Sequence, residues 1–257
     1  MVALQDIRTG GGYAPLPAPT GLDVRLATTP AEVRQAQRLR YGVFAEELGA
    51  RVPGATLGLD RDRFDPYCDH LIVEERATGQ VVGTYRILPP TRRRDAGGWY
   101  CAAEFDVLGL EPMADRTVEI GRACVAPTYR NGHAISLLWA GLLRYVLERG
   151  YRHVIGCASI ETDDGGHIAA SLCRYVLQHH RAPRPWRVTP HRAFVLEGWR
   201  DVADAPQPPL LKGYLRLGAR VCGAPAWDGD FNTADLLMML PVADINPRYV
   251  QRLLRIA

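Results

Sequence analysis

Residues 117–125 read Thr-Val-Glu-Ile-Gly-Arg-Ala-Cys-Val, and a short turn at 126–132 leads from them into a periodic segment at 133–149. The first nine residues have the composition of a strand. Apolar residues return every three or four positions in 133–149, which predicts a helix with one buried face. Gly150 ends that helix, and the next apolar stretch, 151–159, predicts a second strand. This strand–helix–strand unit decides the fold class.

The segments around this unit predict further parts of the same sheet. Residues 22–27 alternate like a strand, and Thr78-Gly79 joins two more strands as a tight hairpin. A helix begins at Pro30 and runs to Leu48, and residues 89–116 look irregular. The remaining expected elements are strands at 69–75, 80–88 and 231–240 and helices at 166–179, 207–219 and 247–256. A hairpin joined to a strand–helix–strand unit predicts a mixed α/β fold, with a central twisted mixed sheet flanked by helices.

Composition excludes several classes of protein. Of the 257 residues, 47% are hydrophobic and 23% charged, which is typical of a globular chain and not of a disordered one. No apolar run reaches the roughly 18 residues of a membrane-spanning helix, and the start lacks a secretory signal pattern, so we expect a cytoplasmic protein. Six scattered cysteines without a C-x-x-C pair predict reduced thiols and no metal site. The net charge of +3 is mild, and we expect no nucleic-acid partner.

Two charged residues lie inside the strand at 117–125. Glu119 and Arg122 are three positions apart, so they point to opposite faces of the sheet unless a bulge intervenes. Charges in a buried strand need partners. Glu119 is therefore a candidate general base or amine ligand, and a structural ion pair is the alternative.

The turn before the helix at 133–149 is a second candidate site. It contains Arg130, Asn131, Gly132 and His133, and it places free backbone N–H groups at a helix N-terminus. Such a turn can bind phosphate or pyrophosphate. A plain connection between strand and helix is the alternative.

An acidic loop is the third candidate. Asp60, Asp62 and Asp65 are interleaved with Arg61 and Arg63. The loop lacks the glycine and the closing glutamate of an EF-hand, and the two arginines oppose a cation site. Binding of a substrate ammonium, or helix capping, fits these residues better.

In combination these segments resemble a known family. The chain resembles the GNAT acyltransferase superfamily, in the branch shared by acyl-homoserine lactone synthases and ornithine-lipid N-acyltransferases. The shared residues are Arg40-x-x-x-Phe44, Asp60-x-Asp62-x-x-Asp65, Gly83-Thr84-Tyr85-Arg86-Ile87-Leu88 and Glu119-Ile120-Gly121-Arg122. The blocks at 208–219 and 230–235 resemble the ornithine-lipid enzymes, whereas Asp60 stands where the lactone synthases usually have Glu.

The resemblance implies a reaction and a site. In that family a 3-hydroxyacyl chain moves from the 4'-phosphopantetheine of acyl carrier protein to the α-amine of ornithine, and no cofactor is bound. The implied catalytic residues are Glu119 and Arg122. The implied amino-acid site is Arg40, Phe44, Asp60, Asp62, Asp65 and Arg86, and the implied phosphopantetheine site is Cys124, Val125, Arg130, Asn131, Gly132 and His133. A buried charge network of Arg40, Asp62 and Arg86 is the structural alternative.

The resemblance also implies a division of the chain and a set of partners. Residues 1–21 form a flexible arm, 22–160 the GNAT-like core, and 161–257 a C-terminal extension packed on that core. We expect Arg92, Arg93 and Arg94 to form an exposed basic run for acyl carrier protein or an anionic membrane surface, with a solvated loop as the alternative. A second basic set, for the membrane, is Arg248, Arg252 and Arg255.

Other functions stay open from the sequence. An acyl-homoserine lactone synthase would use S-adenosylmethionine, and related enzymes acylate glycine, glutamine or lysine. A small-acyl CoA acetyltransferase usually has a second glycine in its pyrophosphate turn, whereas this turn has only Gly132. A membrane-surface protein that retains an inactive fold is the non-enzymatic alternative.

Overall fold

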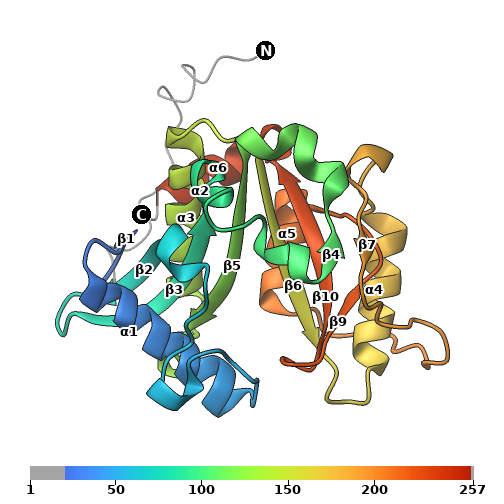
Figure 1. The fold of residues 1–257 in the computed structure, drawn as a ribbon, viewed down its shortest axis with the longest axis horizontal. Helices are drawn as coiled ribbons and strands as arrows, with labels where there is room; N and C mark the ends of the chain where they lie inside the picture. Colours follow the sequence, from blue (N-terminus) through green and yellow to red (C-terminus); the bar gives the residue numbers. More distant parts are fainter. Residues whose placement is uncertain (1–20, 256–257) are drawn as a thin grey trace.

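One mixed sheet organises the part of the chain that the computed structural model describes, residues 21–255. Its order is β1-β2-β3-β5-β6-β10-β8, with β9 paired to β10 (Figure 1). The strands are β1 (Leu22–Leu26), β2 (Asp69–Glu75), β3 (Gln80–Leu88), β5 (Thr117–Val125), β6 (His153–Glu161), β8 (Arg220–Val221), β9 (Ala226–Asp228) and β10 (Thr233–Pro241). The predicted arm at 1–21 lies outside the described residues, apart from Gly21.

The single parallel pair in the described sheet is β5 with β6. Their register runs only from Thr117–His153 to Glu119–Ile155, and beyond it the two ribbons diverge (Figure 1). At the last point of close approach, a Cβ on Gly156 would lie 2.5 Å from the carbonyl oxygen of Ile120. From Ile120 onward, the edge of β5 that faces β6 has no strand partner within residues 21–255.

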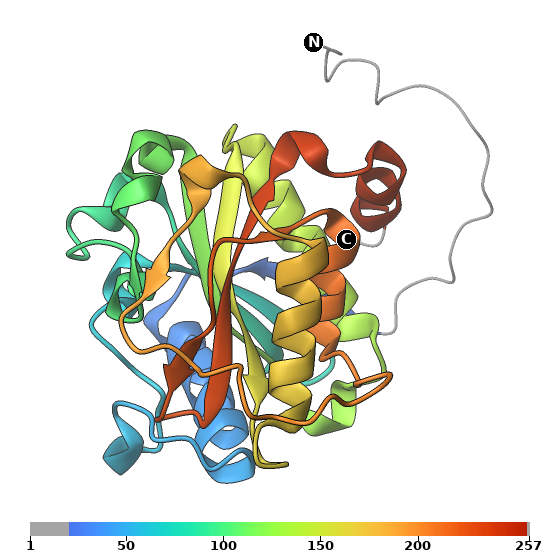
Figure 2. The ribbon, with the colours of Figure 1, turned by 90° about the vertical axis from the view of Figure 1, so that its right-hand side faces the viewer.

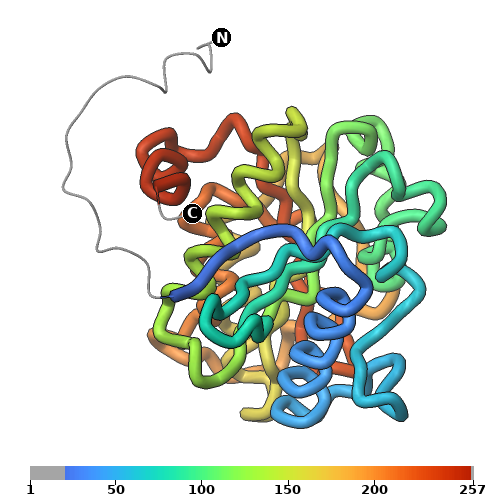
Figure 3. Tube along the Cα trace, turned by 90° about the vertical axis from the view of Figure 1, so that its left-hand side faces the viewer, coloured from blue at the N-terminus to red at the C-terminus, as the bar shows by residue number. Residues whose placement is uncertain are grey.

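Helices cover the two faces of the sheet unequally. One face packs against α3 (His133–Glu148), α4 (His167–His179), α5 (Pro209–Leu217) and α6 (Pro247–Leu254) in a large apolar core. Figure 2 shows α4 and α5 side by side on that face. The other face packs against α1 (Pro30–Tyr41), as the view from the β1 edge shows (Figure 3).

The rest of the α1 face is covered by irregular segments. They include α2 (Pro90–Arg93), the two-stranded pair of β4 (Phe105–Asp106) with β7 (Thr189–Pro190), and several single turns of 3-10 helix. Their apolar side chains form a second core against β6 and β10. Tyr100 and Glu104 belong to this covering layer, so a segment without strong periodicity lies directly over the sheet.

Most predicted elements are confirmed, with differences at their ends. The first helix continues beyond Tyr41 as a π-helix, Gly42–Glu47. The strand expected from Tyr151 begins at His153, because the Tyr151 amide still bonds to the carbonyl of Val146 in α3. No helix within residues 21–255 has the length and apolar character to cross a membrane.

The expectation of an exposed basic run at 92–94 is wrong for two of its three residues. Arg93 is buried, stacks on Trp99 and forms a bidentate ion pair with Glu111. Arg92 forms an ion pair with Asp69. Only Arg94 is exposed, because the helical turn of α2 points its neighbours back toward the protein.

Candidate active site

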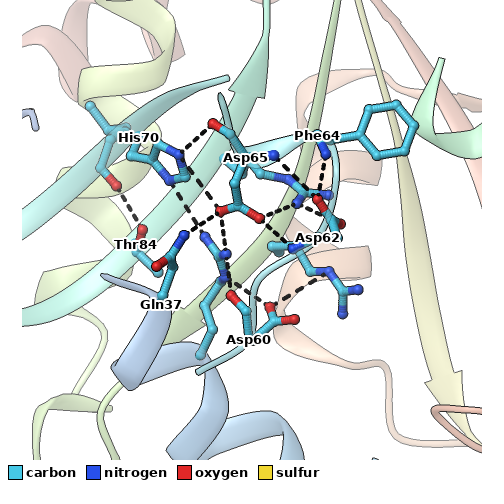
Figure 4. Close-up of polar contacts among 11 residues, drawn as sticks. Gln37, Asp60, Asp62, Phe64, Asp65, His70 and Thr84 are labelled. Carbon is cyan, nitrogen blue, oxygen red and sulfur yellow. Dashed lines mark hydrogen bonds and ion pairs between the residues drawn. The ribbon is translucent and has the colours of Figure 1, made fainter. Parts of the chain in front are cut away.

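A buried charge network joins α1 to the acidic loop (Figure 4). Arg40 is fully buried, and its Nε lies 2.8 Å from Asp60 Oδ2. Its Nη2 lies 2.6 Å from Asp65 Oδ1 and also donates to the Asp60 carbonyl. Burial opposes ionisation of Asp65, but Arg40 and Arg86 outweigh this and hold its pKa below the usual range. The loop charges are therefore neutralised within the protein.

Asp62 occupies a different position from its two neighbours. Its Oδ1 accepts backbone N–H groups from Phe64 and Asp65, which fixes the loop as an Asx-type turn. Its Oδ2 lies 2.7 Å from Arg86 Nη1, and the side chain is 11% exposed. Asp62 thus borders the open cleft, whereas Asp60 and Asp65 lie behind it.

A bulge in β5 changes where its charged side chains point. Between the β3 residues that pair with Gly121 and Cys124 lies one residue, but β5 itself has two at that place. Arg122, in the bulge, has φ of 52°, a left-handed conformation that is rare for a residue with a side chain. Because of this extra residue, Glu119 and Arg122 both reach Tyr100 instead of pointing to opposite faces.

The Arg122 guanidinium lies among aromatic rings. It is 4.7 Å from the ring centre of Phe231, 5.5 Å from Tyr100 and 5.8 Å from Phe44. Its side chain is only 8% exposed, and Nε has no hydrogen-bond partner within the described chain, with Asp60 Oδ2 at 3.7 Å. An aromatic surround keeps such a guanidinium positioned without using its donors, which leaves them for a ligand.

Arg122 lines a cleft of about 580 Å³. The charged residues around it are Arg51, Arg61, Asp62, Arg63, Arg122, Asp228 and Asp230. The aromatic walls are Phe64, Tyr100 and Phe231. A ligand that carries both a carboxylate and an ammonium would find opposite charges for each in this cleft.

Glu119 is buried in β5 and contacts the backbone at Tyr100 and Cys101. It is 3% exposed, and its two oxygens accept the backbone N–H groups of Tyr100 at 2.6 Å and Cys101 at 2.8 Å. Burial raises the pKa of its carboxyl, although these hydrogen bonds work in the opposite direction. A cavity of about 10 Å³ lies beside Glu119, Arg86, Tyr100 and Gly121, at the lower limit of the space that holds one water.

A second acidic group lies where β5 and β6 separate. Ligand atoms of Glu104, Cys157 and Asp235 all lie within 4.8 Å of one another. Burial and the neighbouring carboxylates of Asp235 and Asp228 raise the pKa of Glu104 to about 9. Burial likewise raises the pKa of Asp235 to about 6. Since burial also raises the pKa of the Cys157 thiol, the group is poorly suited to a metal that needs a thiolate.

Sequence reasoning missed most of this second group. Glu104 lies in the segment at 89–116, which has no periodicity that assigns it to a face. Asp228 and Phe231 reach the cleft only because β9 and β10 pair beside β6. Asp235 belongs to the block at 230–235, and the resemblance of that block to the ornithine-lipid enzymes was the one sequence signal that pointed to this residue.

The residues expected to hold phosphopantetheine lie along β5 and at the start of α3. Cys124 is buried beside Phe44, and Arg130 Nε donates to the Val125 carbonyl. Arg130 also forms a bidentate ion pair with Glu47. The Asn131 side chain accepts the His133 N–H, so one of the free N–H groups expected at this turn already has a partner.

Comparison with known proteins decides the family. An L-ornithine Nα-acyltransferase of Brucella abortus is 39% identical over 248 residues, which cover 89% of this chain and 87% of that protein. A protein of the same name from Rhodobacter capsulatus is 34% identical and covers 90% and 94%. The chain belongs to the L-ornithine Nα-acyltransferase family. The acetyltransferase (GNAT) domain also matches, over residues 39–140.

Solved structures agree with this family at the level of the fold. A CoA-dependent acyl-homoserine lactone synthase aligns with a TM-score of 0.54 at 16% identity, over 91% of this chain and 88% of its own. FeeM, an N-acyl amino acid synthase from uncultured soil microbes, aligns at 0.50 and 15% identity, over 92% and 98%. The expected GNAT fold, with a mixed sheet between helices, is confirmed.

Proposed function

We propose that this protein transfers a 3-hydroxyacyl chain from acyl carrier protein to the α-amine of ornithine, which gives lyso-ornithine lipid. The observation that carries this proposal is the similarity, over 89% of the chain, to proteins named L-ornithine Nα-acyltransferase. The cleft supports it, because it presents guanidinium and carboxylate groups together, as recognition of a free amino acid requires.

The reaction needs a neutral amine. The acceptor nitrogen forms a bond to the thioester carbonyl carbon, the C–S bond breaks, and the pantetheine sulfur leaves with the electron pair. The ammonium gives up one proton before attack and the new amide nitrogen gives up another, one of which goes to the sulfur. A buried glutamate with a raised pKa is suited to accept such a proton, and we assign this role to Glu119, acting through a water in the adjacent cavity.

Arg122 is assigned to the acceptor carboxylate. It lines the cleft with its donors largely unused, whereas Arg40 and Arg86 are committed to Asp60, Asp62 and Asp65. Phe44 contributes by packing against the Arg122 guanidinium and Phe231. Residues of the charge network then act by positioning the walls of the site.

The thioester is assigned to the gap between β5 and β6. The backbone N–H groups of residues 122–125 that point away from β3 lie on the edge that loses its β6 partner after Glu119, so they are available to stabilise the oxyanion. The pantetheine arm would follow Cys124 and Val125 toward Arg130, Asn131, Gly132 and His133. Exposed Arg94, and exposed Arg248, Arg252 and Arg255 on α6 and at its end, are the remaining candidates for contact with an anionic membrane.

One experiment tests the function. Purified protein is incubated with ornithine and either 3-hydroxyacyl carrier protein or the matching acyl-CoA, and the products are identified by mass spectrometry. We expect a mass equal to ornithine plus the 3-hydroxy fatty acid minus water. Acylation of glycine, glutamine or lysine but not ornithine, or formation of a lactone from S-adenosylmethionine, would contradict the proposal.

A further inference from the structure

The acidic group at the separation of β5 and β6 has no ion-pair partner among the described side chains. Each aspartate of the loop at 60–65 lies within 4 Å of an arginine nitrogen, whereas Glu104 and Asp235 take part in no ion pair among residues 21–255. Asp235 is held by the hydroxyl groups of Thr233 and Ser159, one on each carboxylate oxygen. Glu104 Oε2 is buried and has no hydrogen-bond partner in the described chain. A buried acceptor without a partner costs free energy unless a ligand supplies the missing donor.

The group lies beside the cleft, because Asp228 of the cleft wall is on β9, which pairs with the start of β10 that carries Asp235. Glu104 and Cys157 are partly exposed, and Ser159, the next residue on that face of β6, is exposed. Asp228, which lines the cleft, acts electrostatically on both Glu104 and Asp235. Arg122 also acts on both carboxyls, and its nine-tenths-buried side chain with an unpartnered Nε lines the same cleft. The acidic group and Arg122 therefore form two ends of one site.

We propose that Glu104 and Asp235 bind the side-chain ammonium of the acceptor amino acid while Arg122 binds its carboxylate. This inference rests on the proposed function and names the residues that select a diamino acid. An ammonium has three N–H donors. Glu104 Oε2 offers an unused acceptor, and each Asp235 oxygen keeps a lone pair beyond its hydroxyl partner. The loop carboxylates, which the sequence favoured for this role, are already occupied by arginines.

The ionisation of these two carboxyls agrees with this assignment. Burial and nearby carboxylates, with Asp228 acting on both groups, favour the protonated forms of Glu104 and Asp235. A bound ammonium supplies a cation and favours ionisation. The site would therefore exchange a proton for the ammonium when ornithine enters.

The test compares ornithine with norvaline, which has the same carbon chain without the side-chain amine. For the intact protein we expect kcat/KM for ornithine to exceed that for norvaline about 10-fold or more, the usual effect of a charge-assisted hydrogen bond. Glu104→Gln and Asp235→Asn should lower this ratio to within about threefold of one, mainly through KM for ornithine. Circular dichroism and a urea titration of each variant report whether it is folded.

Two variants serve as controls. Glu148→Gln removes an exposed carboxylate at the end of α3, on the opposite face of the sheet, and should keep the ratio of the intact protein. Asp62→Asn tests the rival position at the cleft wall. If Asp235→Asn does not fold, Glu104→Gln decides alone, because Glu104 is only partly buried and its replacement has the same shape.

The outcomes separate the two proposals. One contrary result is that the intact protein prefers ornithine while Glu104→Gln keeps the full ornithine-to-norvaline ratio, and another is that only Asp62→Asn loses that ratio. Either result overturns the assignment of the ammonium and leaves the proposed function standing. If the intact protein acylates neither amino acid, the proposed function fails and this inference with it. If dialysis against EDTA abolishes the preference, a metal ion occupies the group and the assignment is again overturned.

Discussion

The carboxylate of Glu119 accepts two backbone hydrogen bonds, and these determine what a substitution there would do. Glutamine keeps the shape of the side chain but has only one acceptor oxygen for the Tyr100 and Cys101 N–H groups. We expect Glu119→Gln to lower kcat by about 10² or more, the scale of a lost general base. It should also reduce the free energy of unfolding by about 1–3 kcal/mol, because one buried N–H loses its partner.

Steady-state kinetics and a denaturant titration of the same preparation separate these effects. Glu148→Gln is the control, since Glu148 is an exposed carboxylate at the end of α3, on the opposite face of the sheet. Near-normal turnover of a folded Glu119→Gln protein would remove Glu119 from the chemistry and leave it the task of anchoring the segment at 100–101.

The raised pKa of Glu104 predicts a pH dependence of stability. Folding raises this pKa from 4.5 to about 9, so between these values the folded state binds more protons than the unfolded state. The free energy of unfolding must then fall as pH rises through that window. Glu104→Gln removes the effect, and the intact protein should lose stability relative to the variant between pH 5.5 and pH 8.5.

Urea unfolding of both proteins at the two pH values measures this difference. Asp235, with a pKa of about 6, titrates in part of the same window. Because Asp235 is present in both proteins, the difference between them reports the contribution of Glu104. A difference that stays constant with pH would show that Glu104 has an ordinary pKa in the folded protein.

The bulge of β5 is the element on which the site depends. It turns Arg122 into the cleft at the cost of a left-handed backbone, which amounts to about 1–2 kcal/mol for a residue with a Cβ. Arg122→Gly removes the side chain and this cost together, whereas Arg122→Ala removes only the side chain. Both variants should lose activity, but the glycine variant should be more stable than the alanine variant by about 1 kcal/mol.

Thermal or urea denaturation of the two variants tests the bulge without reference to the reaction. Equal stability, or greater stability of Arg122→Ala, would mean that residue 122 has an ordinary strand conformation. The activities of the two variants add a second readout. Both should be lost, since neither variant can bind a carboxylate through residue 122.

Sequence reasoning succeeded at this scale where local signals were strong. Periodicity and turn residues predicted β5, α3, the hairpin of β2 with β3, and β10 to within one to three residues. It failed for the bulge, because one extra residue in a strand has no pattern of its own unless a glycine marks it. It also failed for Glu104, whose place depends on how an irregular segment folds back over β6.

At the scale of the whole molecule, the turn before α3 bears on the choice between acyl carrier protein and acyl-CoA as acyl donor. The Asn131 side chain already caps His133, and the turn has a single glycine, so a diphosphate gains few backbone contacts there. We expect acyl carrier protein to be a better donor than acyl-CoA of equal chain length, with rates that fall as salt screens the contact with an acidic carrier. Arg94→Glu should weaken only carrier-dependent turnover.

Assays with both donors at two salt concentrations measure this. Arg252→Glu, on exposed α6, reverses the same charge at a different element and is the matched control. Equal efficiency of the two donors, with no effect of salt on the carrier reaction, would contradict the expectation.

The place of β10 in the sheet has a consequence for how the protein is made. This strand comes from the last tenth of the chain, yet it lies between β6 and β8 and not at an edge. During translation the edge of β6 that pairs with β10 stays open until residues 162–241 have been made. A chain that ends before residue 226 would lack Asp228, Phe231 and Asp235, so premature termination there yields an inactive and aggregation-prone product.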